Sequence, residues 1–184
     1  MGEKQRAFIG AHIARMPGLS LRSIVDSDYP FLNVLYAETR AAEMALVAWT
    51  EPEKTHFLAS QFALQDKHYR NVYKGADFLV VEYLGEPIGR VYIYRSAGEI
   101  RLMEITLVPA SRNRGVGSAL LHELMEEAGD ADAQLTLHIE PENPAQRLYQ
   151  RLGFRLIEHR GAYDFLGWRS TSDGSGDSDP ERAS

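Results

Sequence analysis

One stretch of this chain joins a strand to a helix through a glycine loop: Leu107-Val108-Pro109-Ala110-Ser111-Arg112-Asn113-Arg114-Gly115-Val116-Gly117-Ser118-Ala119-Leu120-Leu121. The apolar run from Ile105 to Val108 has the length and composition of a buried strand, and Pro109 ends it. After the glycines, apolar residues recur with the period of an α-helix. The stretch therefore predicts a strand, a loop and a helix, in that order.

The predicted helix is amphipathic, so one of its sides is expected to pack on a sheet. Its apolar stripe consists of Val116, Leu120, Leu124 and Ala128, widened by Ala119, Leu121 and Met125. The residues expected to face away from the core are His122, Glu123, Glu126 and Glu127.

The start of this helix has the features of an anion site. Gly115 and Gly117 have no side chains, so a ligand can approach backbone N–H groups that the hydrogen bonds of the helix leave unsatisfied. The helix dipole and the nearby Arg112 and Arg114 favour phosphate oxygens. A Walker A loop would need a Lys after Gly117, and a dinucleotide fingerprint would need a glycine in place of Leu120. A glycine-containing helix start with solvated arginines is the alternative interpretation.

Two motifs resemble those of one enzyme family. Arg112-x-x-Gly115-x-Gly117 resembles the acyl-CoA pyrophosphate loop of the GNAT superfamily of N-acyltransferases. Asn143-Pro144-Ala145-Gln146-Arg147-Leu148-Tyr149-Gln150-Arg151-Leu152-Gly153-Phe154 resembles its late segment, in which Asn and Ala open a helix and Gly-Phe leads into a strand. We expect Asn143 to be the N-cap of that helix, with Pro144 at its first position. In many members the Asn lies seven residues before the Tyr, whereas Asn143 lies six before Tyr149.

The resemblance implies an α/β fold with a twisted, mixed but mostly antiparallel sheet of about seven strands. Helices would cover both faces, and the sheet would splay between its fourth and fifth strands. Alternation and turn residues predict strands near 19–24, 78–83, 88–94, 99–108, 135–139, 154–158 and 163–168. A helix is expected after Asp26 or Asp28, and another from the capping box of Thr50 and Glu53 to about Tyr73. The expected packed face of this second helix is Phe57, Gln61, Leu64, His68 and Val72.

The resemblance also implies an acyl-CoA site, with acetyl-CoA as co-substrate and no metal. The pantetheine would lie in the splay against the backbone of Ile105 and Leu107, and the loop N–H groups would hold the pyrophosphate. The expected cofactor-binding residues are Ile105, Leu107, Val108, Arg112, Asn113, Arg114, Gly115, Val116, Gly117, Ser118 and Asn143. Tyr149 would be the general acid that protonates the departing CoA thiolate. The alternative for Tyr149 is an aromatic core residue.

The residue that removes the proton from the amine is left open between Glu104, His138 and a chain of waters. Glu104 lies on the fourth predicted strand beside the splay, and His138 lies on the fifth. The alternatives are a structural carboxylate for Glu104 and a core or surface histidine for His138. The candidates for the acceptor side are Glu43, Trp49, His68, Tyr69 and Tyr73.

Composition excludes several other classes of protein. The 184 residues are 44% hydrophobic and 25% charged, as in an ordinary globular domain, and no apolar run approaches the roughly 18 residues that span a bilayer. The absence of cysteine excludes disulfides, zinc-thiolate sites and a thiol nucleophile. The net charge of −6 and the lack of a basic cluster argue against nucleic-acid binding, including an RNA-modifying acetyltransferase. Because residues 1–16 lack a signal-peptide core, we expect a cytoplasmic location.

The expected organisation is an N-terminal extension over 1–18, an acetyltransferase domain over 19–169 and a disordered, acidic, Ser/Gly-rich tail over 170–184. The expected activity is transfer of the acetyl group of acetyl-CoA to a primary amine of a small molecule or protein. A CoA-binding or partner-binding module with little turnover is the alternative. The strand Tyr163–Trp168 is expected to offer an edge for pairing in a homodimer.

Overall fold

A computed structural model describes residues 11–170, so residues 1–10 of the predicted extension and residues 171–184 of the predicted tail lie outside the described range. The strands are β1 (Leu19–Ser23), β2 (Asp77–Tyr83), β3 (Glu86–Ser96), β4 (Glu99–Leu107), β5 (Gln134–Ile139), β6 (Arg155–Arg160) and β7 (Tyr163–Trp168). The helices are α1 (Ala11–Ala14), α2 (Tyr29–Thr39), α3 (Ala41–Ala45), α4 (Glu51–Val72), α5 (Val116–Asp130) and α6 (Gln146–Arg151). Short 3₁₀ turns, Asp26–Asp28 and Pro109–Ser111, precede α2 and the glycine loop.

The strands form one seven-stranded sheet in the order β1-β2-β3-β4-β5-β7-β6. Its pairs are antiparallel except for β4 and β5, which run parallel. β5 pairs with β4 only from Glu99 to Leu102, whereas β3 follows β4 as far as Leu107. The two strands therefore part after Leu102, which confirms the predicted splay.

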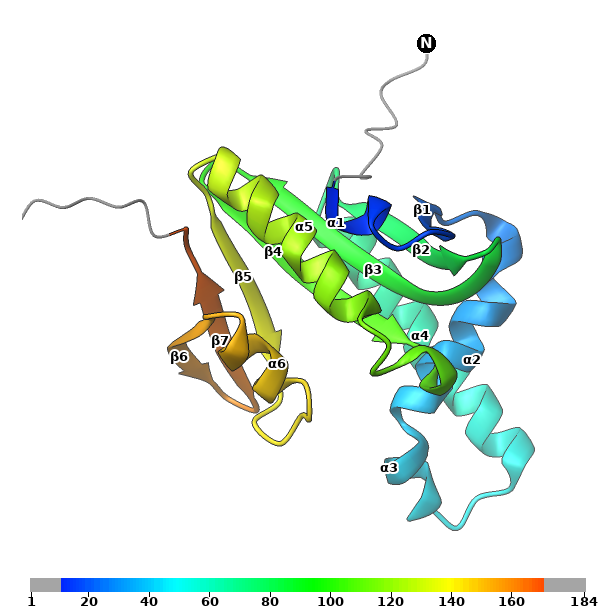
Figure 1. Ribbon diagram of the computed structural model, residues 1–184. Coiled ribbons are helices and arrows are strands. Elements are labelled where there is room, and N and C mark those ends of the chain that lie inside the picture. The colour runs from blue at the N-terminus through cyan, green and yellow to red at the C-terminus, as the bar shows by residue number, and fades with distance from the viewer. Residues whose placement is uncertain (1–10, 171–184) are drawn as a thin grey trace, which may run out of the picture.

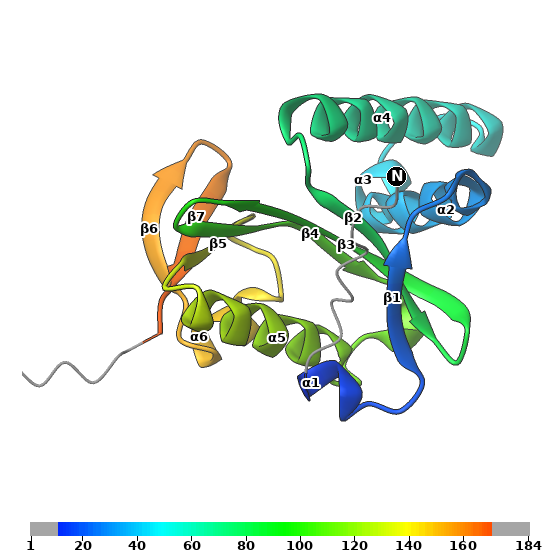
Figure 2. The same cartoon turned by 90° about the horizontal axis from the view of Figure 1, so that it is seen from above.

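The sheet separates two layers of helices (Figures 1 and 2). Seen from above in Figure 2, α1, α5 and α6 lie on one side of the sheet, and α2 and α4 lie on the other. The turn between β6 and β7 extends toward the side that carries α4. The helices on both faces and the mixed sheet agree with the predicted fold class.

The main apolar core lies between α5 and the sheet. The predicted stripe of α5 contributes Val116, Leu120, Leu124 and Ala128, and β5 contributes Leu135, Leu137 and Ile139. The prediction for Glu123 is wrong, because its side chain is buried. Its Oε2 accepts hydrogen bonds from the backbone N–H groups of His12 (3.0 Å) and Ile13 (3.2 Å), since α1 packs over this side of α5.

The packed face of α4 also differs from the prediction. The buried residues of α4 are Leu58, Phe62 and Asp66, whereas Leu64 and Val72 are 61% and 56% exposed. The reason is that α4 packs on α2 and on a sheet face rich in polar and aromatic side chains. An apolar periodicity consequently does not identify the face of α4 that points inward.

Two expectations about the late segment need correction. α6 begins at Gln146 rather than after Asn143, because Asn143 opens a separate turn, in which its Oδ1 accepts from the N–H of Ala145 (2.9 Å) and its carbonyl accepts from the N–H of Gln146 (3.0 Å). β7 is not an edge strand, because it lies between β5 and β6. The edges of the sheet are therefore β1 and β6. Within residues 11–170, no helix has both the length and the apolar composition needed to cross a bilayer.

Candidate active site

A bulge in β4 determines which way Glu104 points. Tyr92 pairs with Glu104, but the next residue, Ile93, pairs with Leu102, so Met103 is an extra residue in β4. Such an insertion reverses the alternation of side chains along a strand. Leu102 therefore belongs to the core on the α5 face, while Glu104 shares the opposite face with its cross-strand neighbour Tyr92. The bulge lies where β5 leaves β4, so Glu104 sits beside the splay.

Glu104 is held by two neighbours from the same sheet face. The Thr106 hydroxyl donates a 2.5 Å hydrogen bond to Oε1 of Glu104. The same Oε1 lies 3.6 Å from Nη2 of Arg90. The Glu104 side chain is 19% exposed, so its carboxylate is still reached by solvent. A solvated carboxylate of this kind can accept a proton.

Tyr149 projects from α6 into the core on the other side of the sheet. Its side chain is buried, and its ring meets that of Phe154 edge-on with centroids 5.4 Å apart. Burial, followed by the charge of Glu104, raises the pKa of Tyr149 to about 12. The charge of Glu104, on the other face of the sheet, therefore contributes to the raised pKa of Tyr149. At neutral pH the Tyr149 hydroxyl keeps its proton.

Beyond Leu102, one edge of β4 has no neighbouring strand. The Val108 N–H donates to the Ile88 carbonyl (2.9 Å), and backbone groups alternate in direction along an antiparallel strand. Consequently the N–H and C=O groups of Ile105 and Leu107 point toward the side that β5 has left. The Leu107 carbonyl accepts a 2.9 Å hydrogen bond from Nε of Arg112, which ties the loop to the end of the strand.

The glycine loop has the geometry of an anion cradle. Gly115 has φ +85° and Asn113 has φ +58°, so both adopt the left-handed conformation. A Cβ placed on Gly115 would meet nothing within 4 Å, which leaves open space beside the helix start. The N–H groups of residues 116–118 lie in the first turn of α5, where a helix offers no acceptor. Arg112 and Arg114 are exposed beside them, and the buried Val116 side chain leaves only its backbone for a ligand.

Two further candidates are Asn143, expected to bind the cofactor, and His138, a possible base. The exposed Asn143 uses Oδ1 within its own turn and keeps its amide N–H₂ group as a donor. The His138 ring stacks on Phe165 with centroids 4.7 Å apart, and its Nε2 lies 3.4 Å from Nη1 of Arg160. Burial, together with the charges of Arg101 and Arg160, lowers the pKa of His138, so the imidazole is neutral at pH 7.

The acceptor-side candidates do not form one group. Tyr69 and Tyr73 face the sheet from α4, with rings edge-on at 6.2 Å. The Tyr69 ring meets that of Tyr92, the cross-strand neighbour of Glu104, with centroids 6.2 Å apart. Burial and then the charge of Glu104 raise the pKa of Tyr69 to about 12. His68 is exposed, Trp49 meets the Phe57 ring edge-on and is 45% exposed, and Glu43 pairs with Arg40 on the surface. Of the five, the structure brings Tyr69 to the site.

Sequence reasoning missed Arg90 and Tyr92. Both lie on β3, the strand beside β4, where Tyr92 pairs with Glu104 and Arg90 pairs with Thr106. Both are buried, at 1% and 0% exposure. In the sequence they read as the polar positions of an alternating strand, which normally face solvent. One signal was present: the apolar positions Ile100 and Leu102 are followed by Ile105 rather than by residue 104, which marks the bulge.

Comparison with known proteins finds one family model that matches part of the chain. Residues 74–156, from the start of β2 to β6, match the family model of the acetyltransferase (GNAT) domain. Among residues 11–170, no group of three or more His, Asp or Glu side chains is placed to hold a metal ion.

Solved acetyltransferases share the fold at low sequence identity. The acetyltransferase of Thermus thermophilus is 18% identical, with a TM-score of 0.62 over 84% of this chain and 99% of its own. The PaiA N-acetyltransferase of Thermoplasma acidophilum, crystallised in complex with coenzyme A, is 15% identical, with a TM-score of 0.61 over 83% of this chain and 99% of its own. Ard1 of Thermoplasma volcanium is 19% identical, with a TM-score of 0.53 over 83% and 97% of the two chains.

Proposed function

We propose that this chain transfers the acetyl group of acetyl-CoA to a primary amine of a small molecule or protein, and the match of residues 74–156 to the model of the acetyltransferase (GNAT) domain supports this proposal. The amine attacks the thioester directly within a ternary complex. One observation carries the proposal: Glu104 lies beside the point where β4 and β5 part, and Tyr149 is buried on the other face of the sheet, where the charge of Glu104 still contributes to its raised pKa. A base and an acid on the two sides of one opening suit a reaction that removes one proton and supplies another.

The glycine loop is the proposed site of the CoA pyrophosphate. The open space at Gly115, the N–H groups of the first turn of α5 and the exposed Arg112 and Arg114 fit a diphosphate. The backbone edge at Ile105 and Leu107 fits the amide groups of pantetheine. Binding of coenzyme A by the Thermoplasma acidophilum structure supports this assignment.

Glu104 and Tyr149 divide the proton transfers between them. Glu104 accepts a proton from the acceptor ammonium, directly or through one water, which frees the nitrogen lone pair to form the N–C bond. Tyr149 donates its proton to the sulfur as the C–S bond breaks, and solvent later restores it. The pKa of about 12 suits Tyr149 to this role, because the hydroxyl is protonated throughout the neutral range.

His138 stays the second candidate for the base. It lies on β5 beyond the last residue paired with β4, and its lowered pKa leaves the ring able to accept a proton at pH 7. Glu104 is preferred because its charge acts on Tyr149, whereas His138 interacts with Arg101 and Arg160. Parallel Glu104→Gln and His138→Gln variants separate the two, since only loss of the base lowers kcat by about 10²-fold or more.

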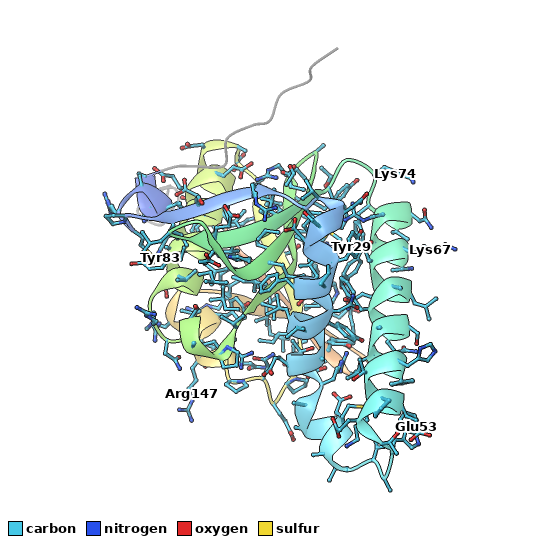
Figure 3. The ribbon with its side chains drawn as sticks, turned by 90° about the vertical axis from the view of Figure 1, so that its right-hand side faces the viewer. Tyr29, Glu53, Lys67, Lys74, Tyr83 and Arg147 are labelled. Carbon is cyan, nitrogen blue, oxygen red and sulfur yellow. The ribbon has the colours of Figure 1, made fainter. Side chains whose placement is uncertain are left out.

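Thermal melting with acetyl-CoA, desulfo-CoA and NAD tests the binding half of the proposal. We expect both CoA compounds, but not NAD, to raise the Tm by several degrees at ligand concentrations far above Kd. Arg114→Ala should reduce this shift, whereas Lys67→Ala is the matched control, because Lys67 projects outward from α4 (Figure 3). If no compound shifts the Tm at millimolar concentration, the loop is only a glycine-containing helix start with solvated arginines, and the proposed CoA site is wrong.

Turnover on a panel of amines, followed by thiol release, tests the chemical half. Acetylation that depends on Tyr149 would establish the enzyme. Binding of acetyl-CoA with only slow hydrolysis, and no acceptor in the panel, would favour a CoA-binding module instead.

A further inference from the structure

The least exposed charged group next to the proposed reaction centre is Arg90. Its side chain is 1% exposed, and it extends from β3 toward α4. Among residues 11–170, Glu104 is the carboxylate within ion-pair distance, with Nη2 of Arg90 3.6 Å from Oε1. The same Nη2 lies 3.4 Å from Oε1 of Gln65 on α4.

The rest of the guanidinium meets aromatic rings rather than hydrogen-bond acceptors. Nε and Nη1 of Arg90 are buried and have no hydrogen-bond partner in the described part of the chain. The guanidinium carbon lies 5.1 Å from the ring centroid of Phe62, 5.2 Å from that of Tyr92 and 5.9 Å from that of Tyr36. Aromatic faces attract a cation but do not neutralise its charge. A buried cation in such a setting requires an anion nearby, and that anion is Glu104.

The contacts of Glu104 divide its two carboxylate oxygens. Both the Thr106 hydroxyl and Arg90 approach Oε1. Within the described residues no side chain donates a hydrogen bond to Oε2. One oxygen is therefore fixed by the protein, and the other is left for a proton that arrives from outside.

We propose that Arg90 is a positioning residue, which places a buried positive charge beside Oε1 of Glu104 and turns Oε2 toward the acceptor amine. The inference rests on the proposed function, in which Glu104 is the base. Arg90 does not touch the substrate, since Phe62, Tyr92 and Glu104 enclose it.

The other ionisable groups around Glu104 are neutral at pH 7. Tyr69 on α4, Tyr92 on β3 and Tyr149 on α6 each interact with the charge of Glu104, and burial is the first cause that raises the pKa of each to about 12. Asp66, which also acts on Tyr92, is paired with Arg70 and accepts a hydrogen bond from Tyr29. Figure 3 shows Tyr29 at the start of α2, on the side that faces α4. Arg90 is thus the cation that balances Glu104.

The pH dependence of kcat/KM in three variants tests the proposal. Arg90→Met keeps the length of the side chain and removes its charge, so we expect the acid limb to move to higher pH by about one unit or more. Arg90→Lys keeps the charge and should hold the acid limb within a few tenths of a unit of its original position. Arg22→Met is the matched control, because Arg22 pairs with Asp28 and Glu82 at the β1 edge of the sheet.

A shift in Arg90→Met alone supports the positioning role. The proposal is overturned if Arg90→Met lowers the Tm while its acid limb coincides with that of the unsubstituted chain. Should Arg90→Met fail to fold, Arg90→Gln against Arg90→Lys gives the same contrast between an uncharged and a charged side chain.

Carbon-13 NMR of glutamate carboxyl groups provides a readout that does not require turnover. The Glu104 resonance, assigned by its absence in Glu104→Gln, should titrate at higher pH in Arg90→Met than in the unsubstituted chain. If the titration moves in Arg90→Met but the original protein transfers no acetyl group, the interaction between Arg90 and Glu104 is supported and the proposed function is contradicted. Acetyl transfer with an unmoved titration would contradict the inference about Arg90 alone.

Discussion

The two faces of the sheet bury different kinds of side chain. On the α5 face, aliphatic residues from α5, β3, β4 and β5 form one continuous core. On the α4 face, the buried groups include Arg90, Asp66 and Tyr92, some of whose polar atoms have no hydrogen-bond partner in the described chain. Burial of an unpaired polar atom destabilises the folded state, whereas burial of an aliphatic group stabilises it. The α4 face also has a smaller apolar cluster, formed by Leu32, Tyr36, Leu58 and Phe62. The contrast indicates that the larger apolar core lies on the α5 face, and that the α4 face combines a smaller core with the buried polar groups of the proposed site.

The opening between β4 and β5 is where the two faces meet. Tyr149 belongs to the core of the α5 face, yet the charge of Glu104 on the other face contributes to its raised pKa. The bulge at Met103 produces this arrangement, because it turns Glu104 away from the apolar core just where β5 departs. If this comparison is right, substitutions on the two faces should affect different quantities.

The largest effect is expected for Tyr149→Phe. The change removes one hydroxyl and keeps the ring that packs on Phe154. We expect kcat to fall by about 10²- to 10⁴-fold, because the departing thiolate loses its acid, with the Tm and the acetyl-CoA-induced shift nearly unchanged. Tyr83→Phe, at the end of β2, is the matched control and should keep full activity. Retention of kcat in Tyr149→Phe would make Tyr149 a core residue only.

Leu124→Ala should show the opposite separation of effects. Leu124 is fully buried on the α5 face, and its truncation leaves a cavity, so we expect a loss of about 2–5 kcal/mol in the free energy of unfolding. Leu64→Ala is the same substitution on α4, where Leu64 is 61% exposed, and should change stability by less than about 0.5 kcal/mol. Denaturant unfolding of both variants measures the difference. Equal losses would contradict the burial of Leu124 in the core between α5 and the sheet.

Sequence reasoning predicted the helix on the α5 face correctly and the helix on the α4 face incorrectly. The stripe from Val116 to Ala128 was predictable, because a helix on an apolar core repeats aliphatic residues at helical spacing. The same rule failed for α4, since Asp66 and the tyrosines turn inward there and Leu64 turns outward. Apolar periodicity locates the face that stabilises a domain and can miss the face that carries its chemistry.

The candidate site divides in a similar way. The glycine loop could be predicted because its residues are adjacent in the sequence and its features are local: glycines, a helix start and two arginines. Arg90 could not, because its role depends on contact with Glu104, Phe62 and Tyr36 from three other elements. The burial of Glu123 was missed for the same reason, since α1 covers it from a distant part of the chain.

The α4 face should also limit stability at high pH. Burial is the main cause that raises the pKa of Tyr92 to about 12, with Arg90 acting in the opposite direction. An unfolded tyrosine ionises near pH 10, so the contribution of this group to stability is complete below about pH 10 and is lost as the pH rises through 12.

Tyr92→Phe tests this expectation. Because the Tyr92 hydroxyl has no hydrogen-bond partner in the described chain, the variant should be within about 1 kcal/mol of the original at pH 7. Between pH 10 and 12 it should lose less stability than the original, by on the order of 2 kcal/mol. Denaturant unfolding at several pH values gives both numbers, and identical alkaline losses in the two proteins would contradict the burial of an ionisable group at this position.

The smallest effect is expected at Glu123, the buried charge on the α5 face. Its carboxylate accepts the N–H groups of His12 and Ile13 in α1, and Ile13 is itself fully buried in the core. Glu123→Gln keeps an acceptor oxygen but loses the charge, so we expect a loss of about 0.5–1 kcal/mol in the free energy of unfolding. Glu126→Gln, one turn along α5, is the control: its carboxylate is 49% exposed and lies 3.6 Å from Nε2 of His12 in α1, and loss of this surface contact should change stability by less than about 0.5 kcal/mol.

The outcome at Glu123 decides how the N-terminal segment is attached. If Glu123→Gln loses stability and Glu126→Gln does not, a charged hydrogen bond holds α1 on α5, and the α5 face contains one polar contact that contributes to the fold. If both variants match the original protein, the burial of Ile13 alone accounts for the docking of α1. Buried charge would then matter only on the face that carries the proposed site, where Arg90 lies beside Glu104.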